Sequence, residues 1–308
     1  MKTVTWTIRS VAVSAVLLSA SACSPPDRPP ALTEGLPEDA AEYLDPDRVS
    51  SFELDDGVVY RFVRSGSQPW HVHLLEVDVS RCELGFQVVR SDDDSRAAVT
   101  DLARRSDPDV LAAINGDFFT PEGAPLGLEV TDGARRGAGT RPVFAWRPGE
   151  LPWVGPVEVE EDRLRMGAWS ISGDRPAFDV QVVGGAPTLV ENGRAVTLSP
   201  DRRAGSDTPQ RNPRTAVGFD DRTLRLWLVV VDGRRTGVSE GMTLPELAGL
   251  FVSLGAGSAV NLDGGGSSVM VVRGSVVSRP SDLLGQRPVA NALLVRRDPG
   301  YCDTDRTG

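Results

Sequence analysis

The chain has 308 residues, 40% of them hydrophobic and 25% charged, an ordinary globular composition with enough length for one large domain or two small ones. Its formal net charge of −10 at pH 7 argues against a nucleic-acid partner, which would normally require a basic surface.

The N-terminus has the pattern of an export signal rather than of a folded segment. Lys2 and Arg9 supply positive charge, and residues 11–20 form an apolar stretch that is too short to span a bilayer. The small residues Ala20-Ser21-Ala22 then resemble a cleavage site. We therefore expect a signal peptide over residues 1–22.

The segment after the expected cleavage site is predicted to be a tether. Cys23 follows the site directly, and a cysteine at this place resembles the lipidated cysteine of bacterial lipoproteins. We expect Cys23 to anchor the exported protein at the outer face of the cytoplasmic membrane, with plain secretion as the alternative. Residues 23–48 are rich in Pro, Asp and Glu and show no apolar period, which is typical of a disordered linker.

The body of the chain, residues 49–298, is predicted to be a single mixed α+β domain, β-rich with few helices, followed by a C-terminal tail over residues 299–308. Short apolar runs bounded by Gly, Pro, Asp and Asn predict its strands. The predicted strands cover residues 58–63, 72–79, 84–89, 110–114, 177–183, 224–231, 269–272, 275–278 and 290–295, and residues 258–260 form one more short apolar run.

Two helices are expected within this domain. The clearer one covers residues 244–254, because Thr243 and Glu246 have the spacing of a capping box and Gly255 is placed to end the helix. A weaker pattern covers residues 96–105.

Two further cysteines remain beyond Cys23. An even pair in an exported protein permits one disulfide, which would join Cys82 to Cys302 and hold the C-terminal tail against the early part of the domain. Two unpaired thiols are the alternative.

Several familiar motifs do not fit. Residues 264–266 are neither a P-loop, because no Lys follows, nor a dinucleotide fingerprint, because Val269 stands where the third glycine should be. Ser239 lies in a nucleophile-elbow pattern, but no His follows it in the chain. His71 and His73 precede it, and as a metal pair they lack further ligands that the sequence would nominate.

Polar residues follow two apolar runs in a similar way. Asn115 and Asp117 come just after one run, and Asn261 and Asp263 come just after another. Either pair could simply close its strand in an Asx turn. Arginines lie between the two places in the chain, so the sequence predicts a polar surface cavity at strand ends.

These residues reach a pattern that resembles a known family. The segments "INGDFF", "NPRTAVG", "VVVDGR", "SEGMTLPELAGLFVSLGA", "VNLDGGGSS", "PSD" and "VANALLV" stand in the order of the phosphodiester glycosidase family, the domain once called DUF2233. The resemblance covers residues 52–295. It implies a single α+β domain with a polar cavity and the removal of N-acetylglucosamine that is linked through its anomeric carbon to a phosphodiester.

The resemblance and the chemistry together suggest roles for individual residues. Cleavage of the sugar C1–O bond needs a carboxylate, and the phosphate leaving group needs little help from a general acid. We expect Asp263 to act as acid/base or nucleophile, with Asp117 as a second carboxylate candidate and Glu240 as a weaker one. Arg214 is the expected phosphate ligand, because a guanidinium offers parallel donors to phosphate oxygens.

The remaining candidates are binding residues. We expect Asn115 and Asn261 to hold sugar hydroxyls or the N-acetyl group, with Gly116 beside Asn115. The N–H groups of the glycine-rich run would form an anion-binding concavity. The residues of the run are Gly264, Gly265, Gly266 and Ser267, and further candidates for orienting groups or closing the cavity are Asp232 and Arg234.

Two other functions stay open at this stage. A metal-dependent phosphodiesterase could use Asp117, Asp263, Asn115 and Asn261 as oxygen ligands for Ca²⁺ or Mg²⁺, although no cofactor is predicted outright. A noncatalytic surface lipoprotein could bind a phosphosugar in the same cavity. The expected partner is a phosphosugar or glycan of the cell envelope or the environment, with no nucleic acid and with membrane contact only through the lipid anchor.

Overall fold

The computed structural model describes residues 35–91, 95–106, 109–137, 141–160, 163–167, 169–172, 178–197 and 210–302. The expected signal peptide, the lipidation of Cys23 and the first part of the tether lie outside these residues. Within them, no helix is both long and apolar enough to cross a membrane.

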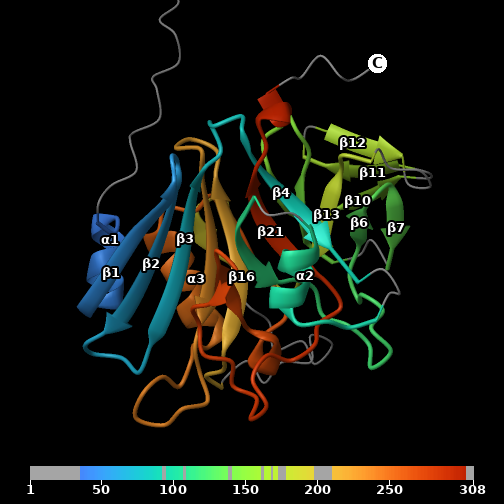
Figure 1. The fold of residues 1–308 in the computed structure, drawn as a ribbon. Helices are drawn as coiled ribbons and strands as arrows, with labels where there is room; N and C mark the ends of the chain where they lie inside the picture. The colour runs from blue at the N-terminus through green and yellow to red at the C-terminus, as the bar shows by residue number, and fades with distance from the viewer. Residues whose placement is uncertain are drawn as a thin grey trace, which may run out of the picture.

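The described residues form a single β-rich domain built from antiparallel sheets (Figure 1). The largest sheet has eight strands, in the order β1 (Pro46–Asp55), β2 (Val58–Ser65), β3 (His71–Asp78), β17 (Arg225–Val231), β16 (Arg214–Asp220), β18 (Ser258–Asn261), β14 (Thr188–Glu191) and β15 (Arg194–Ala195).

Three smaller sheets complete the fold. One has the order β20 (Ser275–Val276), β19 (Met270–Val272), β5 (Val110–Asn115), β21 (Ala292–Arg297) and β4 (Leu84–Val89). Another has the order β7 (Ala134–Arg136), β6 (Glu129–Thr131), β13 (Gln181–Gly184), β8 (Val143–Trp146) and β9 (Trp153–Gly155). The last consists of β10 (Glu158–Glu160), β11 (Arg163–Met166) and β12 (Trp169–Ser172).

The main hydrophobic core lies between the eight-stranded sheet and the sheet that contains β5. Val217 and Leu228 enter it from the first sheet, and Phe86 and Ile114 enter it from the second. β16 and β17 are buried along their whole length, because helices cover their other face. Burial on both faces explains why β17 appears in the sequence as a continuous apolar run rather than as an alternating one.

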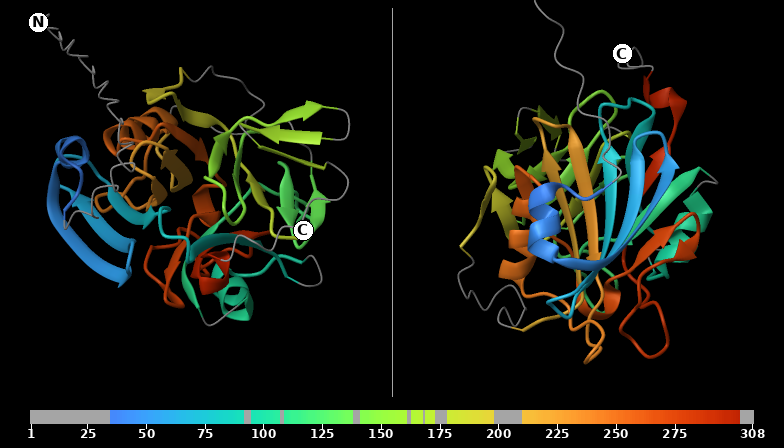
Figure 2. Two further views of the ribbon diagram at one scale, coloured as in Figure 1. Left: turned by 90° about the horizontal axis from the view of Figure 1, so that it is seen from above. Right: turned by 90° about the vertical axis from the view of Figure 1, so that its left-hand side faces the viewer.

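Three α-helices cover the outer faces of the sheets in the described part of the chain. α1 (Glu38–Leu44) and α3 (Leu244–Ser253) pack on the outer face of the eight-stranded sheet, around Trp227 (Figures 1 and 2). α2 (Val99–Ser106) covers β5 and β21. Short 3₁₀ helices are found at Gly265–Ser267 and Pro299–Cys302.

The expected helix before the glycine run is confirmed together with its cap. The Thr243 hydroxyl accepts from the backbone N–H of Glu246, and the Glu246 carboxylate accepts from the N–H of Thr243. This reciprocal pair is the capping box that the sequence predicts.

The prediction of a disordered tether is wrong for its last part. Residues 38–44 form α1, and β1 begins at Pro46. Ala40 and Leu44 are fully buried against the sheet and α3, and Tyr43 stacks on Trp70. The packing of Ala40 and Leu44 against residues distant in the chain therefore orders a segment whose composition alone would indicate a linker.

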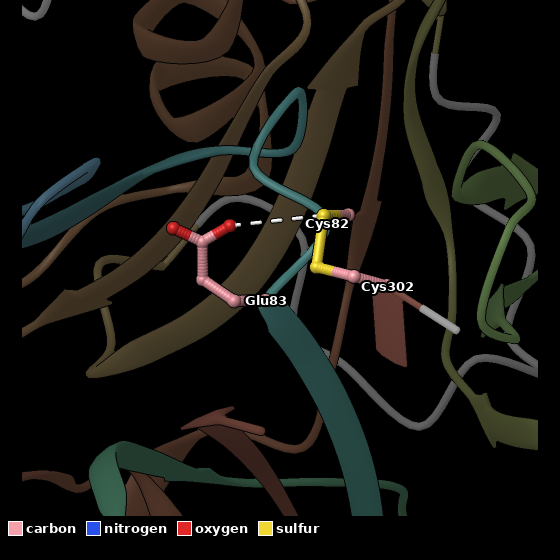
Figure 3. A group of neighbouring side chains, drawn as sticks. All are labelled: Cys82, Glu83 and Cys302. Atoms are coloured by element: carbon pink, nitrogen blue, oxygen red, sulfur yellow. Dashed lines mark hydrogen bonds between the residues drawn. A yellow bond between two sulfur atoms is a disulfide. The ribbon is translucent and has the colours of Figure 1, made fainter. Parts of the chain in front are cut away.

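The C-terminal segment is tied to β4 by a disulfide between Cys82 and Cys302 (Figure 3). The bond closes a loop over a sequence separation of 220 residues. Next to it, the Tyr301 ring packs edge-on against Trp146 and occupies the space that a side chain at position 85 would need.

Candidate functional site

A surface cavity of about 390 Å³ gathers many of the residues that the sequence nominated. Of the predicted site residues, it is lined by Arg214, Arg234, Asn261, Asp263, Gly264, Gly265 and Gly266. The others that line it are Phe118, Gln210, Asn212 and Arg287.

Neighbouring strands of the large sheet bring these groups together. Arg214 is the first residue of β16 and Asn261 is the last residue of β18, and the two strands pair directly with Asn261 opposite Ala216. Because the strands are antiparallel, the start of one lies beside the end of the other. Asp263 follows two residues beyond the end of β18.

The backbone of Asp263 is held from both sides. Its N–H donates to the carbonyl of Gly116 at 3.0 Å, and its carbonyl accepts from Nδ2 of Asn115 at 2.7 Å. Its carboxylate Oδ1 accepts from the N–H of Gly264 at 2.9 Å. The carboxylate therefore projects into the cavity from a fixed backbone.

Burial raises the pKa of the Asp263 carboxyl to about 6. The Ser267 hydroxyl, the Gly264 N–H and the Arg287 guanidinium oppose this rise by favouring the charged form. Asp263 can thus hold or release a proton close to neutral pH.

Arg214 is a buried cation. Its side chain donates from Nε to the carbonyl of Met242 at 2.8 Å and from Nη2 to the carbonyl of Gln210 at 3.2 Å, which leaves further N–H donors for a ligand. Burial and, to a smaller extent, the nearby Arg234 lower its pKa to about 10. Among the described residues, Arg214 makes no ion pair with a carboxylate.

Two more guanidinium groups lie against the glycine run. A side chain at Gly265, which has a φ of +62°, would meet Nη2 of Arg234 at 2.9 Å. A side chain at Gly266 would meet Nη2 of Arg287 at 2.2 Å. The positive φ of Gly265 favours glycine there, and at Gly266 the ends of the Arg287 and Asp282 side chains occupy the space that a side chain would take.

Three of the four N–H groups of the predicted anion-binding concavity already have partners within the protein. The N–H of Gly264 donates to Asp263, that of Gly265 to the carbonyl of Pro213, and that of Ser267 to the carbonyl of Gly264. These donors are already used within the protein, so the arginines rather than the backbone supply the positive charge of the cavity.

Asn261 has one polar atom to spare. Its Nδ2 donates to the carbonyls of Ala186 and Leu262 at 2.7 and 2.8 Å, which fixes the orientation of the amide. Its Oδ1 is buried and makes no hydrogen bond. The amide oxygen thus has an unused acceptor, and its contact with the sugar stays a prediction.

Asn115 does not face the cavity, contrary to expectation. It is fully buried, and its Oδ1 accepts from the Thr215 hydroxyl at 2.7 Å and from the N–H of Val269 at 3.1 Å, while its Nδ2 holds Asp263. It joins β5, β16 and the glycine run, so it positions Asp263 rather than a substrate.

Gly116 and Asp117 also lie outside the cavity lining. A side chain at Gly116 would meet Oδ1 of Asn291 at 2.1 Å, so this glycine is required for packing. Asp117 is 1% exposed, and its Oδ2 accepts from the N–H of Gly127 at 2.6 Å. Burial raises the pKa of Asp117 to about 7. Asp117 is therefore a buried carboxyl group outside the cavity lining rather than a group in contact with solvent.

Glu240 and Asp232 are not part of the cavity lining either. The Glu240 carboxylate faces Arg211, at 4.0 Å from its Nη1. Asp232 is buried next to His73 and lines a different cavity. The Ser239 hydroxyl is bonded to the backbone of Asp232 and His71, which agrees with its dismissal as a nucleophile.

The proposed oxygen ligands for a divalent cation do not converge. Asn261 and Asp263 line the cavity, whereas Asn115 and Asp117 do not. Over the described residues, one group of at least three His, Cys, Asp or Glu side chains has ligand atoms close enough for a single ion, and it consists of Cys82, Glu83 and Cys302 (Figure 3). Its two sulfurs are bonded to each other, so they are not thiolate ligands.

Sequence reasoning missed four members of the cavity. Phe118 and Asn212 lie within the segments "INGDFF" and "NPRTAVG" but were given no role, and Gln210 and Arg287 come from loops with no apolar period. Arg287, which forms an ion pair with Asp282 in the same polar loop, gives no local sequence signal of its function. Asn212 is recognisable only through its bonds to Arg234, at 3.2 and 3.3 Å.

A β-rich domain in which a carboxylate and uncompensated guanidiniums share one cavity defines a protein suited to anionic ligands. Comparison with known families gives the particular class. Residues 108–296, more than half of the chain, match the family described as phosphodiester glycosidase. The chain therefore belongs to the phosphodiester glycosidase family.

Curated relatives match more than half of the chain. The SPbeta prophage-derived uncharacterized protein YomE of Bacillus subtilis is 30% identical over 68% of this chain and 31% of its own length. The bovine N-acetylglucosamine-1-phosphodiester alpha-N-acetylglucosaminidase is 32% identical over 61% of this chain and 35% of its own length. The matched segment thus spans about a third of these relatives.

Solved structures share the fold. The catalytic domain of the zebrafish N-acetylglucosamine-1-phosphodiester alpha-N-acetylglucosaminidase, described as auto-inhibited by its pro-peptide, has a TM-score of 0.58 at 22% identity, covering 81% of this chain and 82% of that one. A hypothetical protein from Synechocystis has a TM-score of 0.60 at 18% identity, covering 82% and 64%.

Proposed function

We propose that the chain hydrolyses the bond between C1 of a sugar and the phosphate oxygen of a sugar 1-phosphodiester, with a GlcNAc 1-phosphodiester as the model substrate. Asp263 is the catalytic carboxylate, Arg214 and Arg234 bind the phosphate, and Asn261 accepts from the sugar.

The observation that carries the proposal is that Arg214 and Asp263 line the same cavity. A buried guanidinium without a carboxylate partner is costly, and an anionic ligand is what would compensate it. Arg234 lowers the pKa of Arg214 further, so a dianionic or bridging oxyanion placed between the two arginines relieves both. The cavity therefore offers the positive charge that a phosphate group requires and a carboxylate in the same lining.

The reaction follows from this arrangement. Water supplies the oxygen that bonds to C1, the C1–O bond breaks, and its electron pair stays on the phosphate oxygen. The products are the free sugar and a phosphate monoester. The second pKa of such a monoester is about 6, so its oxygen leaves without a strong general acid. One carboxylate is then sufficient, either activating the water or attacking C1 itself before water does.

The location of the substrate follows from the N-terminal sequence. Export with a lipid anchor on Cys23 would place the enzyme outside the cytoplasmic membrane, where cell-envelope and environmental glycans carry sugar phosphodiesters. A structural neighbour from Burkholderia pseudomallei is titled a putative exported protein; it has a TM-score of 0.56 at 20% identity, covering 74% of each chain.

The proposal is tested by identifying products. The full-length protein is incubated with UDP-GlcNAc and with a simple GlcNAc 1-phosphodiester, with and without EDTA, and the products are identified by mass. We expect free GlcNAc and an intact phosphate monoester. Asp263→Asn should lower kcat by about a thousandfold or more, and EDTA should have no effect.

Controls separate this activity from the other two functions. Asp101→Asn, a substitution of an exposed carboxylate on α2, should retain the wild-type rate. Release of GlcNAc 1-phosphate, or loss of activity with EDTA, would instead identify a metal-dependent phosphodiesterase. Binding of the diesters without turnover would identify a phosphosugar-binding protein.

A further inference from the structure

A second cavity, of about 290 Å³, lies on the face of β1, β2 and β3. Its charged and titratable lining residues are Arg48, Arg64, His71, His73, Asp232 and Arg279. None of them lines the first cavity. The aromatic rings of Tyr60 and Phe62 complete the wall.

The rim of the second cavity is positively charged. Arg48, Arg64 and Arg279 are exposed at it, and the Arg64 guanidinium is paired with Asp47 at 2.7 Å. The guanidinium groups of Arg48 and Arg279 make no ion pair with the carboxylates that the structure describes. In a chain of net charge −10, this concentration of unpaired arginine is a local exception.

The base of the second cavity is a buried polar chain. The Tyr60 hydroxyl and Nδ1 of His73 are hydrogen-bonded at 2.8 Å. Nε2 of His73 lies 3.3 Å from Oδ2 of Asp232 but makes no hydrogen bond, although the ring is 2% exposed. Asp232 is the one carboxylate of the described lining, and its Oδ1 already accepts from the N–H of Arg279 at 2.8 Å. Its negative charge is thus partly compensated within the protein.

Nucleophilic and metal chemistry fit this cavity poorly. Burial raises the pKa of the Tyr60 hydroxyl, and the charge of Asp232 raises it further, which disfavours a tyrosinate. The ligand atoms of His71, His73 and Asp232 are not close enough together to form a preformed three-ligand site. Binding of an anion uses the exposed arginines of the rim as they stand.

We propose that this second cavity is a binding site for a phosphate group, with Arg48 and Arg279 as its principal ligands. Their guanidinium groups offer paired N–H donors of the kind that phosphate oxygens accept. Burial lowers the pKa of His71, the Asp232 carboxylate opposes this, and the positive charges of Arg279 and Arg64 lower the pKa further.

The linings of the two cavities include residues that are close together in the chain. β17 ends at Val231, Asp232 lines the second cavity and Arg234 lines the first. Successive Cα atoms are about 3.8 Å apart, so the Cα atoms of Asp232 and Arg234 are at most about 7.6 Å apart. Adjacent sites of this kind are suited to neighbouring phosphates of one chain, a reading that rests on the proposed function, and equally to a free phosphate beside the substrate.

The histidines provide a direct test. The chain has only two, and both line the second cavity. Untagged full-length protein is titrated with inorganic phosphate at constant pH and ionic strength while the His ring signals are followed by NMR. We expect saturable shifts in the wild type. Arg48→Gln/Arg279→Gln should weaken the apparent affinity about tenfold or more.

Two control variants define the site. Arg104→Gln removes an exposed arginine on α2 and should leave the shifts as in the wild type, and so should Arg234→Gln, which alters the first cavity. His signals that do not respond to phosphate, or that respond equally in the double variant, would overturn the proposal. Because no turnover is measured, failure of the proposed hydrolysis would not affect this result.

A further titration identifies the source of the phosphate. Asp263→Asn protein is titrated with a single GlcNAc 1-phosphodiester and with a short oligomer of the same repeat. If the oligomer shifts the His signals at lower concentration than the single diester, the site binds a neighbouring phosphate of the substrate. If only inorganic phosphate shifts them, the site binds free phosphate.

Discussion

Asp263 is the residue on which the proposed chemistry depends, and its environment sets the pH at which it can act. Burial raises the pKa of its carboxyl to about 6, above the ordinary value of 3.8. The group is therefore mostly protonated at pH 5 and mostly ionised at pH 7. Both as a base toward water and as a nucleophile it must be ionised.

We therefore predict that kcat/KM rises with pH up to about pH 6 and is constant above it. Below the pKa, the rate should fall about tenfold for each pH unit, because the ionised fraction falls by that factor. Initial rates with UDP-GlcNAc between pH 4.5 and 8 measure this. The substrate is a suitable choice because its phosphodiester does not change charge over this range.

A reversed profile would change the role of the residue. Activity that falls above pH 6 would show that Asp263 acts in its protonated form, as a general acid. The inflection should also persist in His71→Gln, because His71 lines the other cavity and ordinarily titrates in the same range. An inflection that disappears in this variant would assign it to the histidine.

Among the structural elements, Asn115 at the end of β5 has the largest share in placing the catalytic loop. Its amide holds the carbonyl of Asp263, the hydroxyl of Thr215 and the N–H of Val269. These partners come from β16 and from the loop over residues 263–269, both of them far from β5 in the chain, and the bonds to Thr215 and Val269 are buried. The glycine run can therefore be rigid although its residues are intrinsically flexible.

Asn115→Ala should lower the free energy of unfolding by about 2–4 kcal/mol, because three buried polar groups lose their partner. kcat should fall as well, since the Asp263 backbone loses one of its two supports. Urea unfolding and initial rates measure the two effects. Thr215→Val removes only one of the bonds and should cost about 1 kcal/mol. Equal losses in the two variants would show that Asn115 does not join the three segments.

Single strands and helices could be predicted from the sequence better than the contacts between them. Apolar runs gave β3 and β17 of the large sheet and β4, β5, β19 and β21 of the other core sheet, and the capping box gave α3, but the central strand β16 was not predicted. The strands of β6 to β12 are only three or four residues long, which is too short for a periodic pattern to be recognised. α1 was missed because its order comes from burial of Ala40 and Leu44 by residues distant in the chain.

The same limit applies to the site. Asp263, Arg214 and Asn261 could be nominated from the chemistry of strand-end residues. The close approach to the glycine run was also expected, but the groups that make it, Arg234 and Arg287, could not be identified before the loops were placed in space. Asn115 has the residue type of a ligand-binding group, and only its three hydrogen bonds show that it is structural.

At the scale of the whole molecule, both ends of the domain are held in place by contacts distant in sequence. α1 packs on α3 at the N-terminal end, and the Cys82–Cys302 disulfide ties the C-terminal 3₁₀ helix to the start of β4. A fragment limited to residues 52–295 would lose α1, part of β1 and this bond. Experiments on this protein should therefore use the full chain.

The disulfide should contribute measurably to stability. β4 is an edge strand that pairs only with β21 in its sheet, and the bond fixes the chain at the end of that pair. A cross-link that closes so long a loop restricts the unfolded chain, which is typically worth about 2–4 kcal/mol. We predict that Cys82→Ser/Cys302→Ser lowers the free energy of urea unfolding by this amount while the pH profile of the remaining activity is unchanged.

Reduction provides the matched control, because it breaks the same bond without a substitution. Dithiothreitol should shift the urea midpoint of the wild type toward that of the double variant and should leave the variant itself unchanged. A wild-type midpoint that does not respond to reductant would mean that the two sulfurs are not bonded in solution. A bond that does form requires an oxidising compartment, so the stabilisation would also support the proposed export of the chain.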